Sequence, residues 1–163
     1  IRQRLSSSWW MMMEPAWERQ TRKELIRHET RADVVSIGGS VEIGAKPPPG
    51  RIEYALPFGF EQRRDRIETA SLNEVRITPR LTANVQRAGT LRMEGEWRRL
   101  SSNRSHPGYD LTGAWSLGDN WRINAGVDYR IGKSFTAGAS FDSVWRGSAK
   151  PYKTLLMELT AKF

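Results

Sequence analysis

Hydrophobic and polar residues alternate along most of the chain after residue 33. Between residues 75 and 86 every odd position is apolar and every even one is Arg, Thr, Asn or Gln. A period of two places successive side chains on opposite faces of a β-strand. Eight runs of this kind occur between segments rich in turn-forming residues, at 35–43, 52–60, 75–85, 91–97, 109–117, 121–131, 135–145 and 155–163. The pattern therefore predicts an all-β, antiparallel protein of about eight strands.

The two faces of the predicted strands differ sharply in charge. No position on the apolar face of the eight runs is charged, although 27% of all residues are. Each strand of a soluble β-sandwich also has one apolar face. At about 9 to 12 residues, however, most runs are long enough to cross a bilayer at a tilt, whereas soluble strands usually have five or six residues. This length favours a transmembrane β-barrel over a sandwich.

A barrel of this kind assigns roles to two sets of side chains. Aromatic residues near strand ends are expected at the membrane interfaces, and they are Tyr109, Trp115, Trp121, Phe135 and Trp145. The charged face is expected to line the lumen, and its central residues are Arg76, Arg80, Arg92, Glu94, Glu96, Arg98, Arg122, Asp128 and Arg130.

The first 32 residues lack the alternation, so the sequence divides into a segment 1–32 and a barrel region 33–163. Pro15 suits a first helical turn, and Glu24 and His28 are spaced i, i+4. An amphipathic helix is therefore predicted at about residues 15–29. The chain opens with Ile1 and shows no signal peptide, which indicates a mature or truncated product.

Composition excludes several classes of function. The longest apolar run has five residues, at 9–13, so a helical membrane protein is excluded. Because there is no cysteine, the chain has no disulfide, thiolate metal site or thiol nucleophile. The net charge of +8 would suit a nucleic-acid partner. The polar face of the strands is nearly neutral, however, so the excess lies in loops, strand ends and the N-terminal segment.

Candidate catalytic chemistry is sparse. The two histidines are His28 and His106, and His106 lies among serines and an asparagine in the segment 101–108. A serine hydrolase needs a histidine held beside both a serine and a carboxylate or amide, and no spacing here places such a triad. No metal-ligand cluster or nucleotide fingerprint occurs either. We expect no enzymatic activity, metal or cofactor, and hydrolysis through His106 is the weakest alternative.

The C-terminal part of the chain resembles bacterial outer-membrane β-barrel proteins. Residues 124–142, followed by a last alternating strand that ends in Phe163, are similar to the final hairpin of this class. A terminal aromatic preceded by apolar residues at steps of two resembles the signal read by the barrel-assembly machinery, here Leu159, Ala161 and Phe163. The resemblance covers residues 75–163 well, 33–62 loosely and 1–31 not at all. It implies an outer-membrane location, with membrane lipid, the assembly machinery and other envelope subunits as partners and nucleic acid not among them.

Two architectures and two classes of function remain open. Eight strands can close into a small barrel whose opposite charges pair and fill the interior, which gives an anchoring role without a steady pore. Alternatively, the strands are the C-terminal part of a wider barrel in which the six arginines and three acids stay hydrated and favour anions. We expect the closed barrel, with a structural, anchoring or transport role. The alternative function is a soluble all-β module that binds nucleic acid or polysaccharide through a basic, Trp-rich surface.

Overall fold

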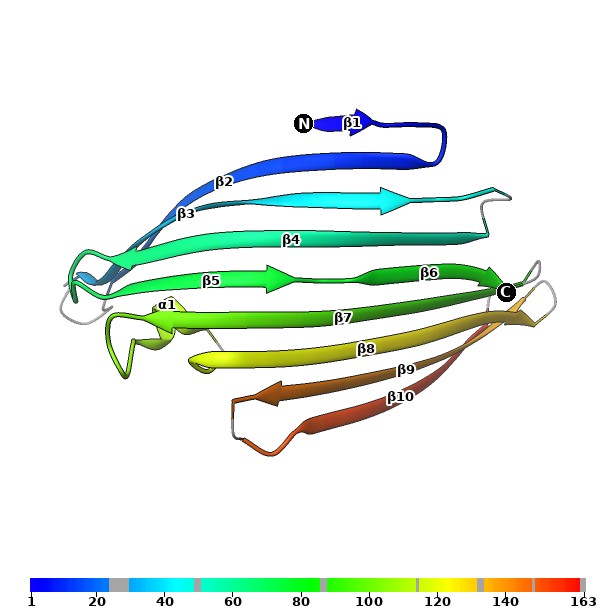
Figure 1. Cartoon of the computed structure of the whole chain (residues 1–163). Helices are drawn as coiled ribbons and strands as arrows, with labels where there is room; N and C mark the ends of the chain where they lie inside the picture. Colours follow the sequence, from blue (N-terminus) through cyan, green and yellow to red (C-terminus); the bar gives the residue numbers. More distant parts are fainter. Residues whose placement is uncertain are drawn as a thin grey trace.

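In the residues that it describes, the computed structural model has one antiparallel β-sheet with a single short helix packed against it (Figure 1). It describes residues 1–23, 30–48, 51–85, 88–113, 115–131, 134–147 and 149–161. The ten strands are β1 (Arg2–Arg4), β2 (Trp9–Lys23), β3 (Thr30–Ala45), β4 (Ile52–Asp65), β5 (Ser71–Ile77), β6 (Arg80–Val85), β7 (Gly89–Ser102), β8 (Gly118–Ile131), β9 (Phe135–Arg146) and β10 (Tyr152–Ala161). The helix, α1, spans Tyr109–Thr112.

The strands follow one another across the sheet as a meander. The order is β1-β2-β3-β4-β5-β7-β8-β9-β10, and β6 continues the line of β5 between β4 and β7. The break between β5 and β6 falls at Thr78-Pro79, because proline has no N–H to donate to a neighbouring strand. Even there the backbone stays bonded, since the Gly95 N–H donates to the Pro79 carbonyl at 2.9 Å. The two outer strands, β1 and β10, lie at opposite edges of one curved layer (Figure 1).

The prediction of a helix at about residues 15–29 is wrong as far as residue 23, because this part of the chain is a strand. Residues 9–23 form β2, which pairs with β3 from Trp9 opposite Ala45 to Lys23 opposite Thr30. Alternate β2 residues from Trp9 to Trp17 share the apolar face of the sheet. The sequence therefore has the period of two that is typical of a strand, but Trp10 and Met12 hide it because they place apolar residues on the polar face as well. Pro15 is tolerated in β2 because proline can occupy the unpaired edge of a sheet. On that side β1 pairs only with residues 10–12 of β2, so no β1 residue lies opposite Pro15.

The remainder of the predicted helix, residues 24–29 with Glu24 and His28, lies outside the described residues. The expected division between residues 32 and 33 falls inside β3, because that strand begins at Thr30. Residues 9–23 are therefore part of the same sheet as the strands that follow.

Seven of the eight predicted runs coincide with strands, and the eighth, 109–117, does not. Residues 109–112 form α1, and Gly113, with a φ of 60°, ends it. The apolar residues of this run do not form the outward face of a strand. Leu111 is instead buried in a small core. That core is completed by residues of the sheet and of a turn, Ala32, Val34, Ala70, Leu72 and Leu100, with Trp115 and Leu117 packed against it.

The sheet has one apolar and one polar face, as the alternation predicts. Cα partners across the strands share a face, and Val41, Phe58, Ile77, Trp97, Trp121 and Trp145 form one apolar row. Many large apolar side chains on this face are exposed, up to 77% for Met157 in β10. The core, α1 and the buried charged residues described below lie on the opposite, polar face. The all-β antiparallel prediction is thus confirmed.

Candidate functional site

All the charged residues predicted to line a lumen lie on the polar face of the sheet. The register places Arg76 opposite Arg98, Arg80 opposite Glu94, and Glu96 opposite Arg122. Arg92, Asp128 and Arg130 occupy positions of the same phase on β7 and β8. The structure therefore brings these nine residues from four strands onto one surface, in which oppositely charged neighbours can pair.

A buried ionic cluster occupies one end of this polar face. The side chain of Glu74 is only 2% exposed, and its carboxylate lies 3.2 Å from Arg63 Nη2 and 3.3 Å from Arg98 Nη1. Arg63 is also bound by Glu61 at 2.9 Å, and Arg98 by Glu96. Two arginines and three carboxylates therefore form one cluster with a formal charge of −1, in which every charged group has at least one partner of opposite charge, as is required when charge is removed from water.

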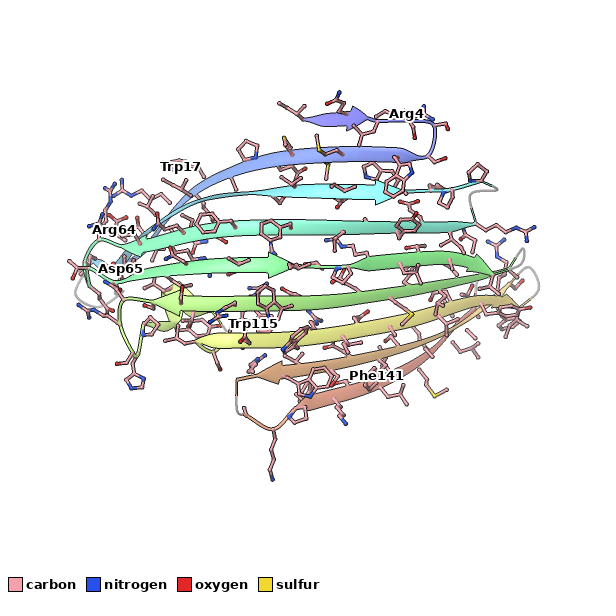
Figure 2. All side chains as sticks on the ribbon, viewed as in Figure 1. Arg4, Trp17, Arg64, Asp65, Trp115 and Phe141 are labelled. Atoms are coloured by element: carbon pink, nitrogen blue, oxygen red, sulfur yellow. The ribbon has the colours of Figure 1, made fainter. Side chains whose placement is uncertain are left out.

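Leu111 and Trp115, from the segment between β7 and β8, lie against this cluster. Arg63 Nη1 donates a hydrogen bond to the Leu111 carbonyl at 2.8 Å, and the Arg98 guanidinium stacks over the Trp115 ring at 4.4 Å. Asn120, fully buried, donates to the Ser116 carbonyl at 2.8 Å. Trp115, expected at a membrane interface, lies instead over the polar face of the sheet (Figure 2). Tyr109, the first residue of α1, is 70% exposed.

More exposed ion pairs continue along the same face. Arg80 bridges Glu42 at 3.5 Å and Glu94 at 3.1 Å. Arg92 pairs with Asp128, and Arg122 with Asp142, each at 2.8 Å. Among the residues that the structure describes, Arg76 and Arg130 are the members of the predicted set without an ion pair. These two guanidinium groups are therefore available to solvent or solute.

A groove of about 320 Å³ runs across this face between β2 and β7. Ser40 and Gly59 lie on its floor, with Glu14 of β2 on one side and Arg76 of β5 on the other. The Arg76 guanidinium extends over Gly59, since a Cβ at that glycine would lie 3.6 Å from Arg76 Nε. A groove with both signs of charge and a floor of small side chains can hold water and small polar solutes.

Sequence reasoning missed two central members of the buried cluster, Arg63 and Glu74. Both lie just outside the apolar runs 52–60 and 75–85, whose ends were set by the last hydrophobic residue. The alternation in fact continues past residue 60, and Gly59, Glu61 and Arg63 follow at steps of two on the polar face of β4. Extending the run by this polar pattern would have included Arg63.

The remaining predicted interface aromatics lie on the apolar face. Trp121 and Trp145 are cross-strand partners, and Trp121 lies 6.3 Å from Trp97 between ring centroids. Phe135 begins β9 and is opposite Ala161. Of the predicted assembly signal, Leu159 and Ala161 lie on the apolar face of β10, and Phe163 lies outside the described residues.

The candidate metal-ligating and catalytic residues lie apart in the part of the chain that the structure describes. No three His, Cys, Asp or Glu side chains in that part are grouped as metal ligands. His106 is exposed in the loop after β7, and His28 is not among the described residues. The helices of the described part are also too short to cross a membrane.

Comparison with known proteins identifies the fold alone. No family model matches the sequence, and no curated protein matches it. The chain is similar to the solved structure of in-vitro folded OmpT, an outer membrane protein of Vibrio cholerae, with a TM-score of 0.65 and 14% identity. The match covers 85% of this chain and 42% of OmpT, so the chain spans less than half the length of that protein. The fold thus resembles that of an outer-membrane β-barrel protein.

Proposed function

We propose that this chain forms part of the wall of a bacterial outer-membrane β-barrel, with its apolar face toward lipid and its polar face toward the lumen. The observation that carries this proposal is the distribution of burial. Glu74 and Glu96 are 1% and 8% exposed, whereas Leu155, Leu159 and Trp17 are 68–69% exposed. A soluble protein buries its large apolar side chains and exposes its charges, and the reverse arrangement is typical of a barrel in a bilayer.

We further propose that additional strands complete the barrel. No strand pairs with the outer edge of β10 or with that of β1 among the described residues. Unpaired backbone groups are not stable in a hydrocarbon environment, so both edges require a neighbouring strand. The 42% coverage of OmpT supports a wall that continues beyond this sheet. This proposal replaces our initial expectation of a closed eight-stranded barrel.

The role that best fits a wider barrel is transport or support of the envelope, without an enzymatic step. In such a barrel the paired charges of the polar face border a hydrated lumen, and the unpaired Arg76 faces the groove beside Glu14. The partners are outer-membrane lipid and the barrel-assembly machinery, with other envelope subunits as further candidates.

Substitution of two β8 residues on opposite faces of the sheet tests which face is turned toward lipid. Val127 lies on the exposed apolar face, and Asn124 lies on the polar face opposite Glu94 and Asp142. Val127→Arg should reduce the stability of the lipid-folded protein by about 2 to 4 kcal/mol, because the charge enters hydrocarbon. Asn124→Arg should change it by about zero, because the new charge meets water and carboxylates.

Urea titration of the protein folded into lipid vesicles measures both values. Equal tolerance of arginine at the two positions would contradict the proposed orientation. A wild-type chain that stays folded and monomeric without detergent would instead support the soluble binding module.

A further inference from the structure

The outward face of β4 changes from apolar to cationic near the end of the strand. Tyr54, Leu56, Phe58 and Phe60 occupy alternate positions, and Gln62 and Arg64 continue the same phase. Gln62 donates to the Asn73 side chain at 3.1 Å, so β5 has changed to polar residues at the same level. At about 3.3 Å per residue, Arg64 lies roughly 13 Å beyond Phe60 along the strand.

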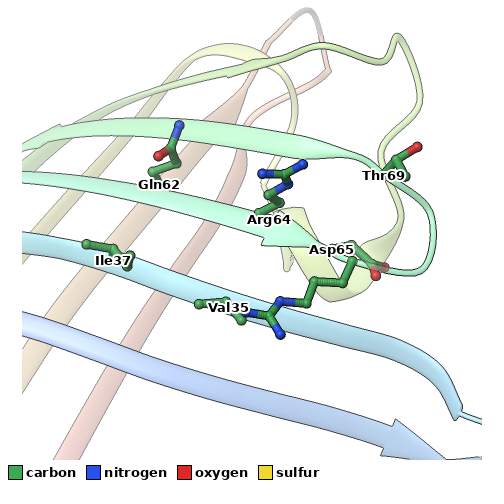
Figure 3. A pocket seen from close by; sticks show the side chains of 7 residues that line it. Val35, Ile37, Gln62, Arg64, Asp65 and Thr69 are labelled. Carbon is green, nitrogen blue, oxygen red and sulfur yellow. The ribbon is translucent and has the colours of Figure 1, made fainter.

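A hollow of about 430 Å³ lies at this boundary. Val35 and Ile37 of β3 form one side, and Gln62 and Arg64 of β4 form the other, with Thr69 in the following turn (Figure 3). Arg66 also lines the hollow. The site therefore combines two aliphatic side chains, two guanidinium groups and the carboxylate of Asp65.

Neither Arg64 nor Arg66 has an ion pair among the described residues. The nearby carboxylates have other partners: Asp33 accepts two hydrogen bonds from Arg19, each at 2.8 Å. Asp65 is buried, and its Oδ1 accepts the backbone N–H of Ile67 at 2.8 Å. Glu68 Oε2 would lie 3.8 Å from a Cβ at Gly108, which places that carboxylate beside the loop before α1. Asp65 also lines the hollow, so its lining carries two guanidinium groups against one carboxylate, a formal excess of one positive charge.

The turn that carries Arg66 is held firmly in place. The Arg66 N–H donates to the Asp33 carbonyl at 3.0 Å, and the Asp65 N–H donates to the Ala70 carbonyl at 2.9 Å. The next turn residue of the hollow, Thr69, has a φ of 53° and accepts hydrogen bonds from Asn103 and Arg104. The second cation of the site is therefore presented by an ordered backbone.

We propose that this hollow binds the anionic phosphate headgroup of a membrane lipid. Arg64 and Arg66 contact the phosphate, and Val35 and Ile37 contact the first carbons of the acyl chains. This inference rests on the proposed membrane orientation, because only then does the apolar face end at headgroup level here. Basic side chains at a membrane surface attract anionic lipid by about fivefold in affinity for each residue.

The test uses the full-length protein reconstituted in phosphatidylcholine vesicles that contain spin-labelled phosphatidylglycerol or spin-labelled phosphatidylcholine. Electron spin resonance then gives the association constant of each lipid from its motionally restricted fraction. The wild-type protein should prefer phosphatidylglycerol. Arg64→Gln should reduce this preference by about fivefold and Arg64→Gln with Arg66→Gln further, whereas the double lysine variant should keep most of it.

Arg51→Gln is the matched control, since Arg51 is an exposed arginine directly before the other end of β4. It should leave the preference nearly unchanged. Restricted lipid without any preference, or equal preference in the wild type and the double glutamine variant, would overturn the inference and leave the proposed function intact. Loss of the preference with inorganic phosphate, but not with sodium chloride of equal ionic strength, would support the inference, because free phosphate then competes with the lipid headgroup for the same site. Absence of restricted lipid would overturn both proposals.

Discussion

At the residue scale, Glu74 shows how the polar face can hold buried charge. Its carboxylate accepts a hydrogen bond from Arg63 of β4 and forms an ion pair with Arg98 of β7, and each arginine has a further carboxylate in Glu61 or Glu96. Removal of the Glu74 charge would leave each arginine with a single carboxylate and would break the connection between the two pairs. The cluster therefore ties β4, β5 and β7 together at the covered end of the sheet.

Glu74→Gln should lower the free energy of unfolding by about 2 kcal/mol, because Arg63 and Arg98 lose the buried carboxylate that they share and keep only Glu61 and Glu96. Urea titration of the folded protein in detergent, followed by tryptophan fluorescence, measures the change. Glu53→Gln is the control, since Glu53 is 45% exposed and pairs only with Lys46. The control should cost less than about 1 kcal/mol, and a similar cost for the two variants would refute the buried-cluster argument.

At the element scale, the segment 103–117 behaves as a cover rather than as a strand. It is held by Leu111 in the core, by Trp115 under Arg98, and by hydrogen bonds between Asn120 and Ser116. Local opening of such a segment is governed by the few contacts that dock it. These contacts belong to side chains that the alternation alone would have directed outward.

Leu111→Ala should loosen this cover, because the side chain is 1% exposed and packs in the small core. Such truncations cost about 2 to 5 kcal/mol, and trypsin should then cut faster after Arg104 in the exposed loop. Tyr109→Ala in the same helix is the control, since Tyr109 is 70% exposed. Mass spectrometry of the fragments locates the cut, and an unchanged rate in the Leu111 variant would show that the core does not hold the segment.

The last strand carries the predicted assembly signal. Leu159 and Ala161 lie in β10 on the apolar face, opposite Ala137 and Phe135. Deletion of Phe163 should slow assembly into the outer membrane in cells, and it should change the urea midpoint of the folded protein little, because recognition precedes folding. Membrane fractionation over time measures the assembly rate. Normal assembly of the shortened chain would show that the terminal pattern is not a signal.

At the scale of the whole molecule, ion pairing neutralises part of the polar face and leaves charges of both signs without an ion pair among the described residues, with Glu14 and Glu158 as the acidic examples. Arg80, Arg92, Arg98 and Arg122 have carboxylate partners, and opposite charges in close pairs largely cancel at a distance. Arg76 and Arg130 have none within the described part of the sheet. The field in a hydrated lumen should therefore depend on these two residues more than on the paired arginines.

We expect the full-length chain to conduct ions in a planar bilayer, and we expect Arg76 and Arg130 to raise its permeability to anions relative to cations. Arg76→Gln with Arg130→Gln should reduce the chloride-to-potassium permeability ratio. Arg122→Gln with Asp142→Asn should leave the ratio unchanged, because it removes a neutral pair. Reversal potentials in a salt gradient give the ratio. Absence of any conductance would instead support a closed, charge-filled interior and an anchoring role.

The sequence by itself determined the strands of residues 33–107 and 118–161 and their two faces. Alternation is a local property of the chain, and a strand translates it directly into an apolar and a polar side. The charged set from Arg76 to Arg130 was predictable for the same reason, as was the outer-membrane type of fold.

Only the tertiary structure decided which neighbours complete these patterns. The segment 9–23 became a strand because β3 offers a partner along its full length, and 109–117 did not because Leu111 and Trp115 find contacts on the polar face. Likewise, the register decides that Glu74 pairs with both Arg63 and Arg98 and that Arg76 has no ion pair among the described residues. Such contacts join residues that are far apart in the chain, and a local pattern contains no information about them.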